Sequence, residues 1–458
     1  MDNPLDESRQ HRSRQTWERE ACEEANPPCL VPLRSEFQQW IPLQSGSCCL
    51  PSRHRQCPDC DHPTTLRLAH MTDSAANAAK QPPPLAGRHI TYVVENGDQV
   101  AEDVRQQMRA VRRLGAFVTA CCLCGAGQAL TPNQDYDHLS LLGMEVRQLS
   151  GSRIHAIRRF RNHLRQDTSD TLICDQYKSI TTAVLATAIP GTGRRRIIAL
   201  IRGFHAARSR TRRRFYRLFS RRIDAFITLT NAHKHHIHTM MPWFPLARFH
   251  VIPVYLDAEA LRAQMVPAAD ARDALGIGAG PFTFGTVTRF DACKRLTDLV
   301  AASAILRDQG YDFRVVIVGD GREREALEVQ IARAQLADHV LLTGVVPAAA
   351  RYFKAFDTFV FPSEGDSFGR VLLEARAAEL PIIAADCGGP PEVIGSHGMI
   401  ARHRDPMDLA SKMAAMLETP LPKRKDAARE GARWSRATYT VEALTAELHQ
   451  VLEKRGPD

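Results

Sequence analysis

Short apolar runs alternate with longer amphipathic segments from about residue 86 onward. The runs Arg88–Val94 and Ala116–Leu123 are apolar enough to form buried strands, and the segment 99–114 between them has helical spacing and ends at Gly115. Strands that alternate with helices in this way are typical of parallel sheets built from βαβ units. The pattern therefore predicts an α/β protein.

The alternation occurs in two blocks, which predicts two domains. Strands are expected in the first block at 171–174, 197–201 and 225–230, and in the second at 282–287, 313–318, 340–346 and 358–361. The predicted boundaries are 86–257 for the first domain and 258–433 for the second. The last segment, 434–458, is expected to be a helix that crosses back to the first domain.

Residues 1–85 lack helical or strand periodicity and are rich in Arg, Pro, Ser and Gln, so they are predicted to be a mostly disordered leader. Two interpretations of the leader stay open. It could be upstream sequence, with the functional chain starting near Met71, or it could hold a small zinc site. The candidate zinc ligands are Cys48, Cys49, His54, Cys57, Cys60 and His62.

Length and charge narrow the functional classes. The chain has 458 residues and a net charge of +9, which favours anionic partners. No apolar run approaches the roughly 18 residues that a membrane-spanning helix needs, and the acidic N-terminus does not resemble a signal peptide. The expected location is cytoplasmic, peripheral on the cytoplasmic face of the inner membrane.

The positive charge is concentrated in the segment Arg194–Arg222, which contains twelve arginines and no acidic residue. Phe215, Leu218, Phe219 and Ile223 recur within and just after it at helical spacing, which predicts a helix with one apolar face. Such a helix suits an anionic membrane surface or a phosphorylated acceptor. The alternative is a helix packed on its own domain with solvated arginines.

The stretch 357–375 carries the strongest candidate chemistry. It predicts a strand at Thr358–Phe361, a loop that contains Gly365, and a helix from Ser367 to Ala378. The first amides of such a helix, Ser367 to Arg370, would form a cradle for phosphate, and Gly369 would let the ligand approach the backbone.

Two carboxylates frame this cradle and suit a nucleotide sugar. Asp366 lies at the start of the predicted helix and Glu374 lies further along it. Amides would take the diphosphate, Glu374 the ribose hydroxyls, and Asp366 the sugar. The alternative is a helix capped by Asp366, with Glu374 on a solvated face.

Further candidates follow predicted strands, at the edge where α/β proteins bind ligands. Arg289 and Lys294 come after the strand 282–287 and could neutralise a leaving diphosphate. His205 follows the strand 197–201. A helix with His233, His235, His236 and His238 is interpreted as a solvated face, so no metal site is predicted.

Residues 366–375, with the sequence DSFGRVLLEA, resemble the pattern E-x-F-G-x-x-x-x-E-A of the retaining GT-B glycosyltransferases of family 4. The resemblance implies two Rossmann-like domains whose parallel sheets face each other across a cleft. It assigns catalytic roles to Arg289, Lys294, Asp366 and His205. Because Asp stands in place of the first motif Glu, Glu364 is an alternative to Asp366 as the sugar-facing carboxylate. The implied donor-binding residues are Gly319, Gly344, Glu364, Ser367, Phe368, Gly369, Arg370 and Glu374.

The predicted function is transfer of a sugar, with retention of anomeric configuration, from a UDP- or GDP-type donor to a lipid-linked or lipopolysaccharide-type glycan. No cofactor, metal or nucleic-acid partner is expected. Two alternatives remain. A sugar-nucleotide epimerase of the same fold would not need the arginine-rich segment, and a basic nucleic-acid-binding protein would leave the two carboxylates without a role.

Overall fold

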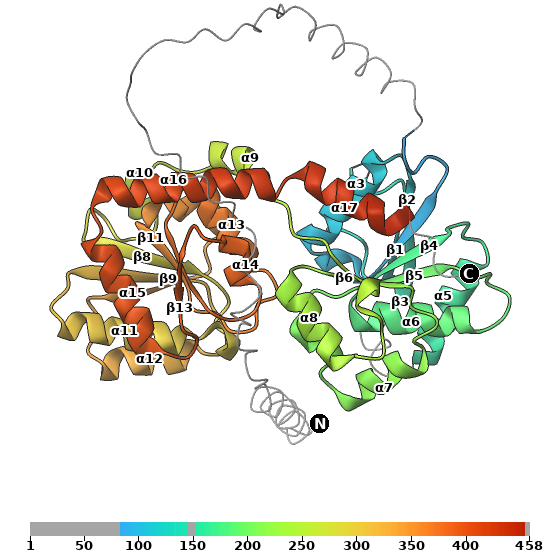
Figure 1. Ribbon diagram of the computed structural model, residues 1–458, viewed down its shortest axis with the longest axis horizontal. Coiled ribbons are helices and arrows are strands. Elements are labelled where there is room, and N and C mark those ends of the chain that lie inside the picture. Colours follow the sequence, from blue (N-terminus) through green and yellow to red (C-terminus); the bar gives the residue numbers. More distant parts are fainter. Residues whose placement is uncertain (1–82, 133, 145–152, 454–458) are drawn as a thin grey trace, which may run out of the picture. The chain divides into compact units, whose positions relative to one another are not determined.

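A computed structural model of the chain describes residues 83–132, 134–144 and 153–453. The predicted leader and its candidate zinc ligands therefore lie outside the described residues, apart from the last positions before residue 86. The described chain forms two α/β lobes (Figure 1). The predicted fold class, two Rossmann-like parallel sheets in a GT-B arrangement, is confirmed.

The first lobe contains a seven-stranded parallel sheet with the strand order β3-β2-β1-β4-β5-β6-β7. Its strands are β1 (His89–Asn96), β2 (Phe117–Cys124), β3 (His138–Met144), β4 (Thr171–Asp175), β5 (Arg196–Leu200), β6 (Ala225–Thr228) and β7 (Phe249–Val251). Its helices are η1 (Gly97–Gln99), α3 (Glu102–Arg113), α5 (Arg153–Leu164), α6 (Gln176–Ala188), η2 (Phe204–Ala207), α7 (Arg210–Leu218), α8 (Asn231–Met240) and η3 (Leu246–Arg248).

The second lobe contains a six-stranded parallel sheet with the order β10-β9-β8-β11-β12-β13. Its strands are β8 (Phe282–Val287), β9 (Phe313–Val318), β10 (Val340–Gly344), β11 (Thr358–Phe361), β12 (Ile382–Ala385) and β13 (Met399–Ala401). Its helices are α9 (Ala258–Ala263), α10 (Ala268–Ala274), η4 (Ala292–Lys294), α11 (Leu296–Asp308), α12 (Arg324–Arg333), η5 (Ala349–Ala355), α13 (Arg370–Ala377), α14 (Pro390–Ile394), α15 (Pro406–Glu418) and α16 (Leu421–Thr438).

The central positions of the strands are mostly apolar because both faces of each sheet are covered. In β1, Ile90 and Tyr92 belong to the core on one face, and Val93 belongs to the core on the other. Alternate side chains of a strand point to opposite faces, so a strand covered on both sides favours apolar residues at consecutive positions. The last helix, α17 (Val441–Glu453), places Leu444 and Leu448 in the core that contains Ile90.

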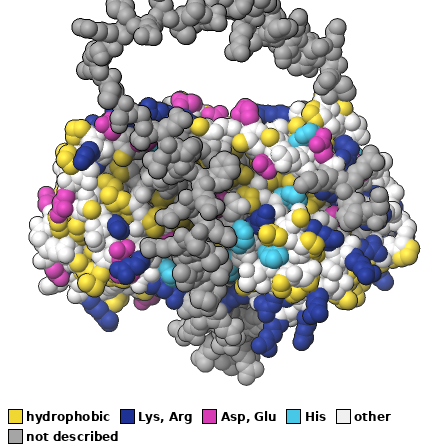
Figure 2. Space-filling view, viewed as in Figure 1, with side chains coloured by type: hydrophobic (Ala, Val, Ile, Leu, Met, Phe, Trp, Pro, Cys, Tyr) yellow, Lys and Arg dark blue, Asp and Glu magenta, His cyan; other side chains and the backbone are white. Residues whose placement is uncertain are grey.

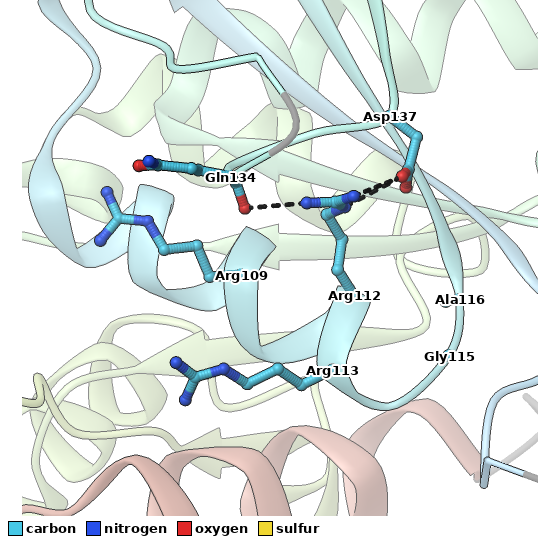
Figure 3. Close-up of a pocket in the computed structure, with 7 residues that line it drawn as sticks. All are labelled: Arg109, Arg112, Arg113, Gly115, Ala116, Gln134 and Asp137. Atoms are coloured by element: carbon cyan, nitrogen blue, oxygen red, sulfur yellow. Dashed lines mark hydrogen bonds and ion pairs between the residues drawn. The ribbon is translucent and has the colours of Figure 1, made fainter.

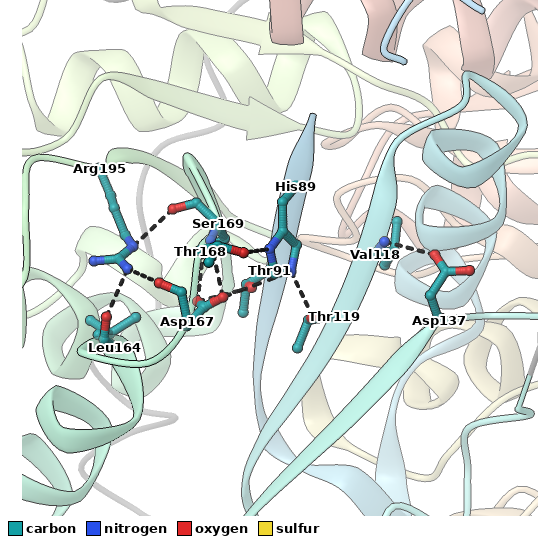
Figure 4. A network of polar contacts seen from close by, with 10 residues as sticks. All are labelled: His89, Thr91, Val118, Thr119, Asp137, Leu164, Asp167, Thr168, Ser169 and Arg195. Carbon is teal, nitrogen blue, oxygen red and sulfur yellow. Dashed lines mark hydrogen bonds and ion pairs between the residues drawn. The ribbon is translucent and has the colours of Figure 1, made fainter. Parts of the chain in front are cut away.

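A polar network lies beside the amino-terminal end of β1, where the first lobe buries several charged groups (Figure 4). The ring nitrogens of His89 contact the hydroxyls of Thr168 and Thr119, both at 2.8 Å. Arg195 donates to the carbonyl oxygens of Ser169 at 2.9 Å and Leu164 at 2.7 Å. Arg195 is thus a structural residue of the loop before β5 and not a surface cation.

The arginine-rich segment is therefore divided between internal and surface roles. Arg196 donates to the Leu452 carbonyl of α17 at 3.2 Å, and Arg222 donates to the Thr187 carbonyl at 2.9 Å. By contrast, Arg214 and Arg217 of α7 are exposed, and their side chains make no hydrogen bond or ion pair with any described residue. Fewer arginines of the segment Arg194–Arg222 are therefore available at the surface than the sequence suggested.

The apolar face of α7 packs on its own lobe. Tyr216 is fully buried, and Phe215, Phe219 and Ile223 pack in the same core. The prediction that Leu218 belongs to this face was wrong, because its side chain is 77% exposed. The core uses Tyr216 instead, so Leu218 points outward beside the exposed arginines. None of the helices in the described ranges is long and apolar enough to cross a membrane.

Arg376 is an unusual core residue of the second lobe. Its side chain is 2% exposed and has no carboxylate partner in the described chain, although it donates to the carbonyls of Ile394 and His397. Burial lowers its pKa to about 10. Gly431 of α16 makes room for it, because a Cβ atom at Gly431 would lie 2.2 Å from Nη1 of Arg376.

This contact predicts coupling between the two positions. Gly431→Ala should lower the free energy of unfolding by about 1–3 kcal/mol, because the added methyl group overpacks against the buried guanidinium. In an Arg376→Met background the same change should be close to neutral, since the obstructing group is gone. Urea denaturation of the single and double variants measures the coupling. Gly203→Ala, where a Cβ meets open space, is the control. Additive effects of the two changes would contradict the prediction.

Candidate active site

The donor stretch folds as a strand, a loop and a helix, but the helix starts later than predicted. β11 ends at Phe361 and α13 begins at Arg370. Gly369 has φ +81°, a left-handed conformation that a right-handed helix excludes. The predicted start at Ser367 was therefore wrong. The unpaired first amides of the helix belong to Arg370 and Val371, because the amide of Leu372 already donates to the Gly369 carbonyl at 2.8 Å.

Asp366 faces a cation in the loop before this helix. Lys294 of η4 donates to its two carboxylate oxygens at 2.8 and 2.7 Å, and the Ser363 hydroxyl donates to the same carboxylate. Most of the Lys294 side chain is buried. The structure thus brings together two predicted site residues that are 72 positions apart.

Glu364 occupies a different place from Asp366. Its carboxylate accepts two hydrogen bonds from Arg404, at 2.8 and 2.7 Å, and lies 3.8 Å from Arg295. Arg295 and Arg404 both have left-handed backbones, with φ of 50° and 56°. The Glu364 amide donates to the Cys293 carbonyl at 2.7 Å. Glu364 therefore links three loops, and Asp366 is the carboxylate beside Lys294.

Glu374 lies one helical turn after Arg370, and the two side chains form an ion pair at 3.4 Å. Burial raises the pKa of Glu374, and the charge of Arg370 opposes this effect. Because most of its surface is removed from water, this carboxylate gains strongly from hydrogen-bond donors that a ligand supplies. Phe368 is buried, with its ring 5.5 Å from that of Tyr439, so its side chain packs in the core.

Arg289 is the most exposed of the predicted cations, at 81% of its side chain, and pairs with Asp291 at 3.3 Å. Cys293, the residue before Lys294, lies in the same segment after β8 as Arg289. Burial raises the pKa of Cys293, Lys294 and Arg289 lower it, and Asp366 and Asp291 raise it further. The charges of Lys294, Arg289, Asp366 and Asp291 therefore all act on this one thiol beside the donor loop.

The predicted strand-end glycines make room for the loop that carries Arg289. A Cβ atom at Gly319, whose φ is +137°, would lie 1.8 Å from the Thr288 carbonyl oxygen. The amide of Gly319 donates to the Gly344 carbonyl at 2.9 Å. Gly319 thus packs directly against the loop, and Gly344 fixes the backbone of Gly319.

Ser367 connects the donor loop to the first lobe. Its hydroxyl donates to the Arg202 carbonyl at 2.6 Å, and its carbonyl accepts from the Thr230 hydroxyl at 2.9 Å. Glu392 of α14 accepts from the backbone amide of Asn231, at the start of α8, at 2.8 Å. The glycine turn before α14 also contacts the loop, because the Gly389 amide donates to the Asp366 carbonyl at 2.8 Å.

A buried charge network lies next to Ser367 in the first lobe, and the sequence analysis missed it. Arg202 donates to Asp175 through two nitrogens, at 2.8 and 3.1 Å, and lies 3.4 Å from Asp103. Burial raises the pKa of both aspartates, while Arg202 opposes the rise. Asp175 ends β4 and Arg202 follows β5, so their positions at strand ends could have identified them.

His205 lies three residues after Arg202 in the chain, but it is not the residue that directly follows β5. It belongs to η2, and its carbonyl accepts from Arg212 at 3.0 Å. Partial burial and the charges of Arg208 and Arg212 lower its pKa, which favours the neutral imidazole. Phe204, the preceding residue, lies 3.4 Å from the position of a Cβ atom at Gly388 in the second lobe.

The histidines of α8 were predicted to form a solvated face, and this prediction was wrong for His233. His233 is fully buried, with its ring 4.9 Å from that of Phe204, and burial lowers its pKa to about 4. His236 contacts the same ring at 4.7 Å. Within the described ranges no group of three His, Cys, Asp or Glu side chains is arranged to hold a metal ion.

Comparison with known families and structures agrees with this architecture. The model described as Glycosyltransferase Family 4 matches residues 100–260, and the model described as Glycosyl transferases group 1 matches residues 268–434. The two matches correspond to the first and second lobes.

Similar proteins include the putative glycosyltransferase EpsF of Bacillus subtilis, which is 32% identical over 139 residues. That alignment covers 30% of this chain and 36% of EpsF, and the chain spans between 30% and 49% of the first curated relatives. Among solved structures, Anabaena HepE in complex with UDP has a TM-score of 0.66 and 18% identity, covering 80% of this chain and 99% of HepE.

WaaG, a glycosyltransferase involved in lipopolysaccharide biosynthesis, has a TM-score of 0.59 and 16% identity, covering 80% of this chain and all of WaaG. At such identities the structural matches establish the fold alone. The two family models, which match the two lobes in succession, show that the chain belongs to the group 1 and family 4 glycosyltransferases.

Proposed function

We propose that the protein transfers a sugar from a nucleoside-diphosphate donor, of UDP or GDP type, to a glycan hydroxyl with retention of anomeric configuration. The observation that carries the proposal is the convergence of Lys294, Asp366 and the start of α13 on one loop. The chain's similarity to HepE, which was solved with UDP, supports a nucleotide donor. No metal ion or other cofactor is part of the proposal.

The donor would be held by groups with separate roles. The amides of Arg370 and Val371 and the side chains of Lys294 and Arg289 would bind the diphosphate. Glu374 would accept hydrogen bonds from the ribose hydroxyls, and Asp366 would orient the sugar. Glu364 is a positioning residue, because its bonds to Arg295 and Arg404 fix the loop from which Lys294 extends.

Charge stabilisation would be the main source of catalysis. As the bond to the sugar breaks, negative charge grows on the departing diphosphate, and cations fixed beforehand stabilise it without reorganisation. The Lys294 ammonium is held by Asp366, so it is already oriented toward the donor loop. The hydroxyl that attacks would approach from the first lobe, near His205 and Asp103.

The acceptor is proposed to be a lipid-linked or lipopolysaccharide-type glycan. The exposed arginines of α7 and the outward side chain of Leu218 give the first lobe a surface that suits anionic headgroups. Figure 2 shows Lys and Arg side chains gathered at the lower edge of this lobe. WaaG, whose fold is similar, is involved in lipopolysaccharide biosynthesis. The proposed location is the cytoplasmic face of the inner membrane.

Release of nucleoside diphosphate from UDP- and GDP-sugars, with and without a bacterial lipid extract, tests the function. A transferase needs the extract for sustained release. A sugar-nucleotide epimerase releases none, and a nucleic-acid-binding protein responds to neither addition. Absence of extract-dependent release across the donor panel would contradict the proposal.

Two substitutions should separate donor binding from catalysis. Glu374→Ala should raise the KM for the donor by about tenfold or more, since the ribose loses a partly buried acceptor worth about 1.5–3 kcal/mol. Lys294→Ala should lower kcat by about a hundredfold, as loss of an oxyanion donor does. Arg322→Gln removes an exposed arginine that also pairs with Asp291 and serves as the control. Unchanged kinetics in both site variants would refute the assigned roles.

The α7 surface predicts charge-dependent membrane binding. Arg214→Gln with Arg217→Gln should weaken association with phosphatidylglycerol vesicles by about thirtyfold, because each charge near an anionic surface contributes about 1 kcal/mol. Lys423→Gln with Lys425→Gln removes two exposed charges from α16 and should have little effect. Sedimentation with the vesicles, compared with phosphatidylcholine vesicles, measures the difference. Equal losses in the two pairs would mean that net charge alone drives binding.

A further inference from the structure

A cavity of about 600 Å³ opens beside the second half of α3 in the first lobe (Figure 3). Arg109, Arg112 and Arg113 of one helix line it, together with the Gly115–Ala116 turn and the residues Gln134 and Asp137. This volume lies in the range of small-molecule sites. The arginines give the cavity a cationic wall that no step of the proposed transfer uses.

Two of the three guanidinium groups are fixed by carboxylates. Arg109 donates to Asp135, which is completely buried, at 2.6 Å. Arg112 donates to Asp137 at 2.7 and 3.0 Å and to the Gln134 carbonyl at 3.2 Å, as Figure 3 shows. Asp137 is itself fixed, because it accepts from the Val118 amide at 2.8 Å. The wall is therefore preorganised, which lowers the entropic cost of binding a ligand.

Arg113 carries the charge that the surrounding residues do not neutralise. Glu102 and Asp135 pair with Arg105 and Arg109, and Asp137 pairs with Arg112. Arg113 is exposed, and its side chain makes no hydrogen bond or ion pair with any described residue. A helix C-terminus attracts cations, which accounts for arginines at this end of α3. That attraction does not account for a concave wall of three guanidinium groups around an open volume.

We propose that this cavity binds the anionic oxygens of a small molecule, either a phosphate ester or a carboxylate. Arginine forks match both groups in geometry and charge. One uncompensated cation and two ordered neighbours suit a single anionic group on a ligand with otherwise polar surface. The inference does not depend on the proposed transfer.

The cavity is separate from the proposed donor site. The Gly115–Ala116 turn precedes β2, and Asp137 precedes β3, so the cavity lies at the amino-terminal edge of the first sheet. Ser367 of the donor loop contacts Arg202, which follows β5 at the opposite, carboxyl-terminal edge. A ligand in the cavity would thus occupy a second site, at the far end of α3 from Asp103.

Calorimetric titration of the full chain with sodium phosphate and with sodium acetate, at ionic strength held constant with sodium chloride, tests this site. At least one of the two anions should bind saturably, and the tighter one identifies the ligand group. Arg113→Gln should weaken that binding by about tenfold or more, because a charge-assisted hydrogen bond is lost. Its melting temperature without ligand should not change, since Arg113 has no described partner. Arg217→Gln, which removes another exposed arginine, from α7, should bind as the wild type does.

Hydrogen–deuterium exchange locates the bound anion. Protection should fall on segments 105–117 and 134–142, and Arg113→Gln should abolish it. Protection confined to the donor loops, 289–295 and 363–374, would overturn the proposal and leave the proposed transfer intact. Equal weakening by Arg113→Gln and Arg217→Gln would overturn it too, because it would show general attraction to a basic protein. Failure of both anions to bind above the chloride background would also overturn the proposal.

Discussion

The hydrogen bonds made by the backbone and hydroxyl of one short loop, Asp366 to Gly369, hold the candidate site together. Within the second lobe, the Gly389 amide binds the carbonyl of Asp366. Toward the first lobe, Ser367 donates to Arg202 and accepts from Thr230. These groups leave the loop little freedom. The loop can therefore present both a carboxylate and the open end of a helix to the same ligand without first having to order itself.

Each carboxylate in or just before this loop is paired with one or more cations from neighbouring loops. Glu364 restrains two arginines with left-handed backbones, Arg295 and Arg404, and Asp366 restrains Lys294. Left-handed conformations of such residues cost free energy and persist only where the surroundings enforce them. Two such residues contact Glu364, which indicates that the charges of this site are held in fixed positions. Fixed positive charges suit a reaction whose barrier arises from negative charge that grows on a leaving group.

Much of the fold could be predicted from the sequence because the strands are buried on both faces and read as continuous apolar runs. The exact start of α13 could not, because the pattern after Pro362 does not show that Gly369 takes a left-handed conformation. Leu218 was expected on the apolar face of α7, but the structure buries Tyr216 there and exposes Leu218, for a related reason. Helical spacing defines a face only to within one residue on either side, and an aromatic ring fits the core better there.

The site residues that belong to the local sequence motif of the second lobe could be predicted. The residues that reach the site from the first lobe were harder to predict. Lys294 and Asp366 were both named from the sequence, and the structure brings them together. The sequence indicates His205 in the loop after β5 and gives no sign of a role for Arg202, whose carboxylate partners come from other segments. Only the structure shows that Arg202 lies between two buried aspartates and contacts Ser367. Contacts between distant segments leave little local signal.

The exposed thiol of Cys293 gives the donor loop a practical property. Cys121, Cys122, Cys124 and Cys174 are buried in the first lobe, whereas Cys293 is open to solvent beside Lys294 and Asp366. A maleimide fluorophore attached there would sit within a few side chains of the loop and report its occupancy through a change in emission. Because burial raises the pKa of this thiol, the attachment should go faster at alkaline pH, where more of the thiol is ionised.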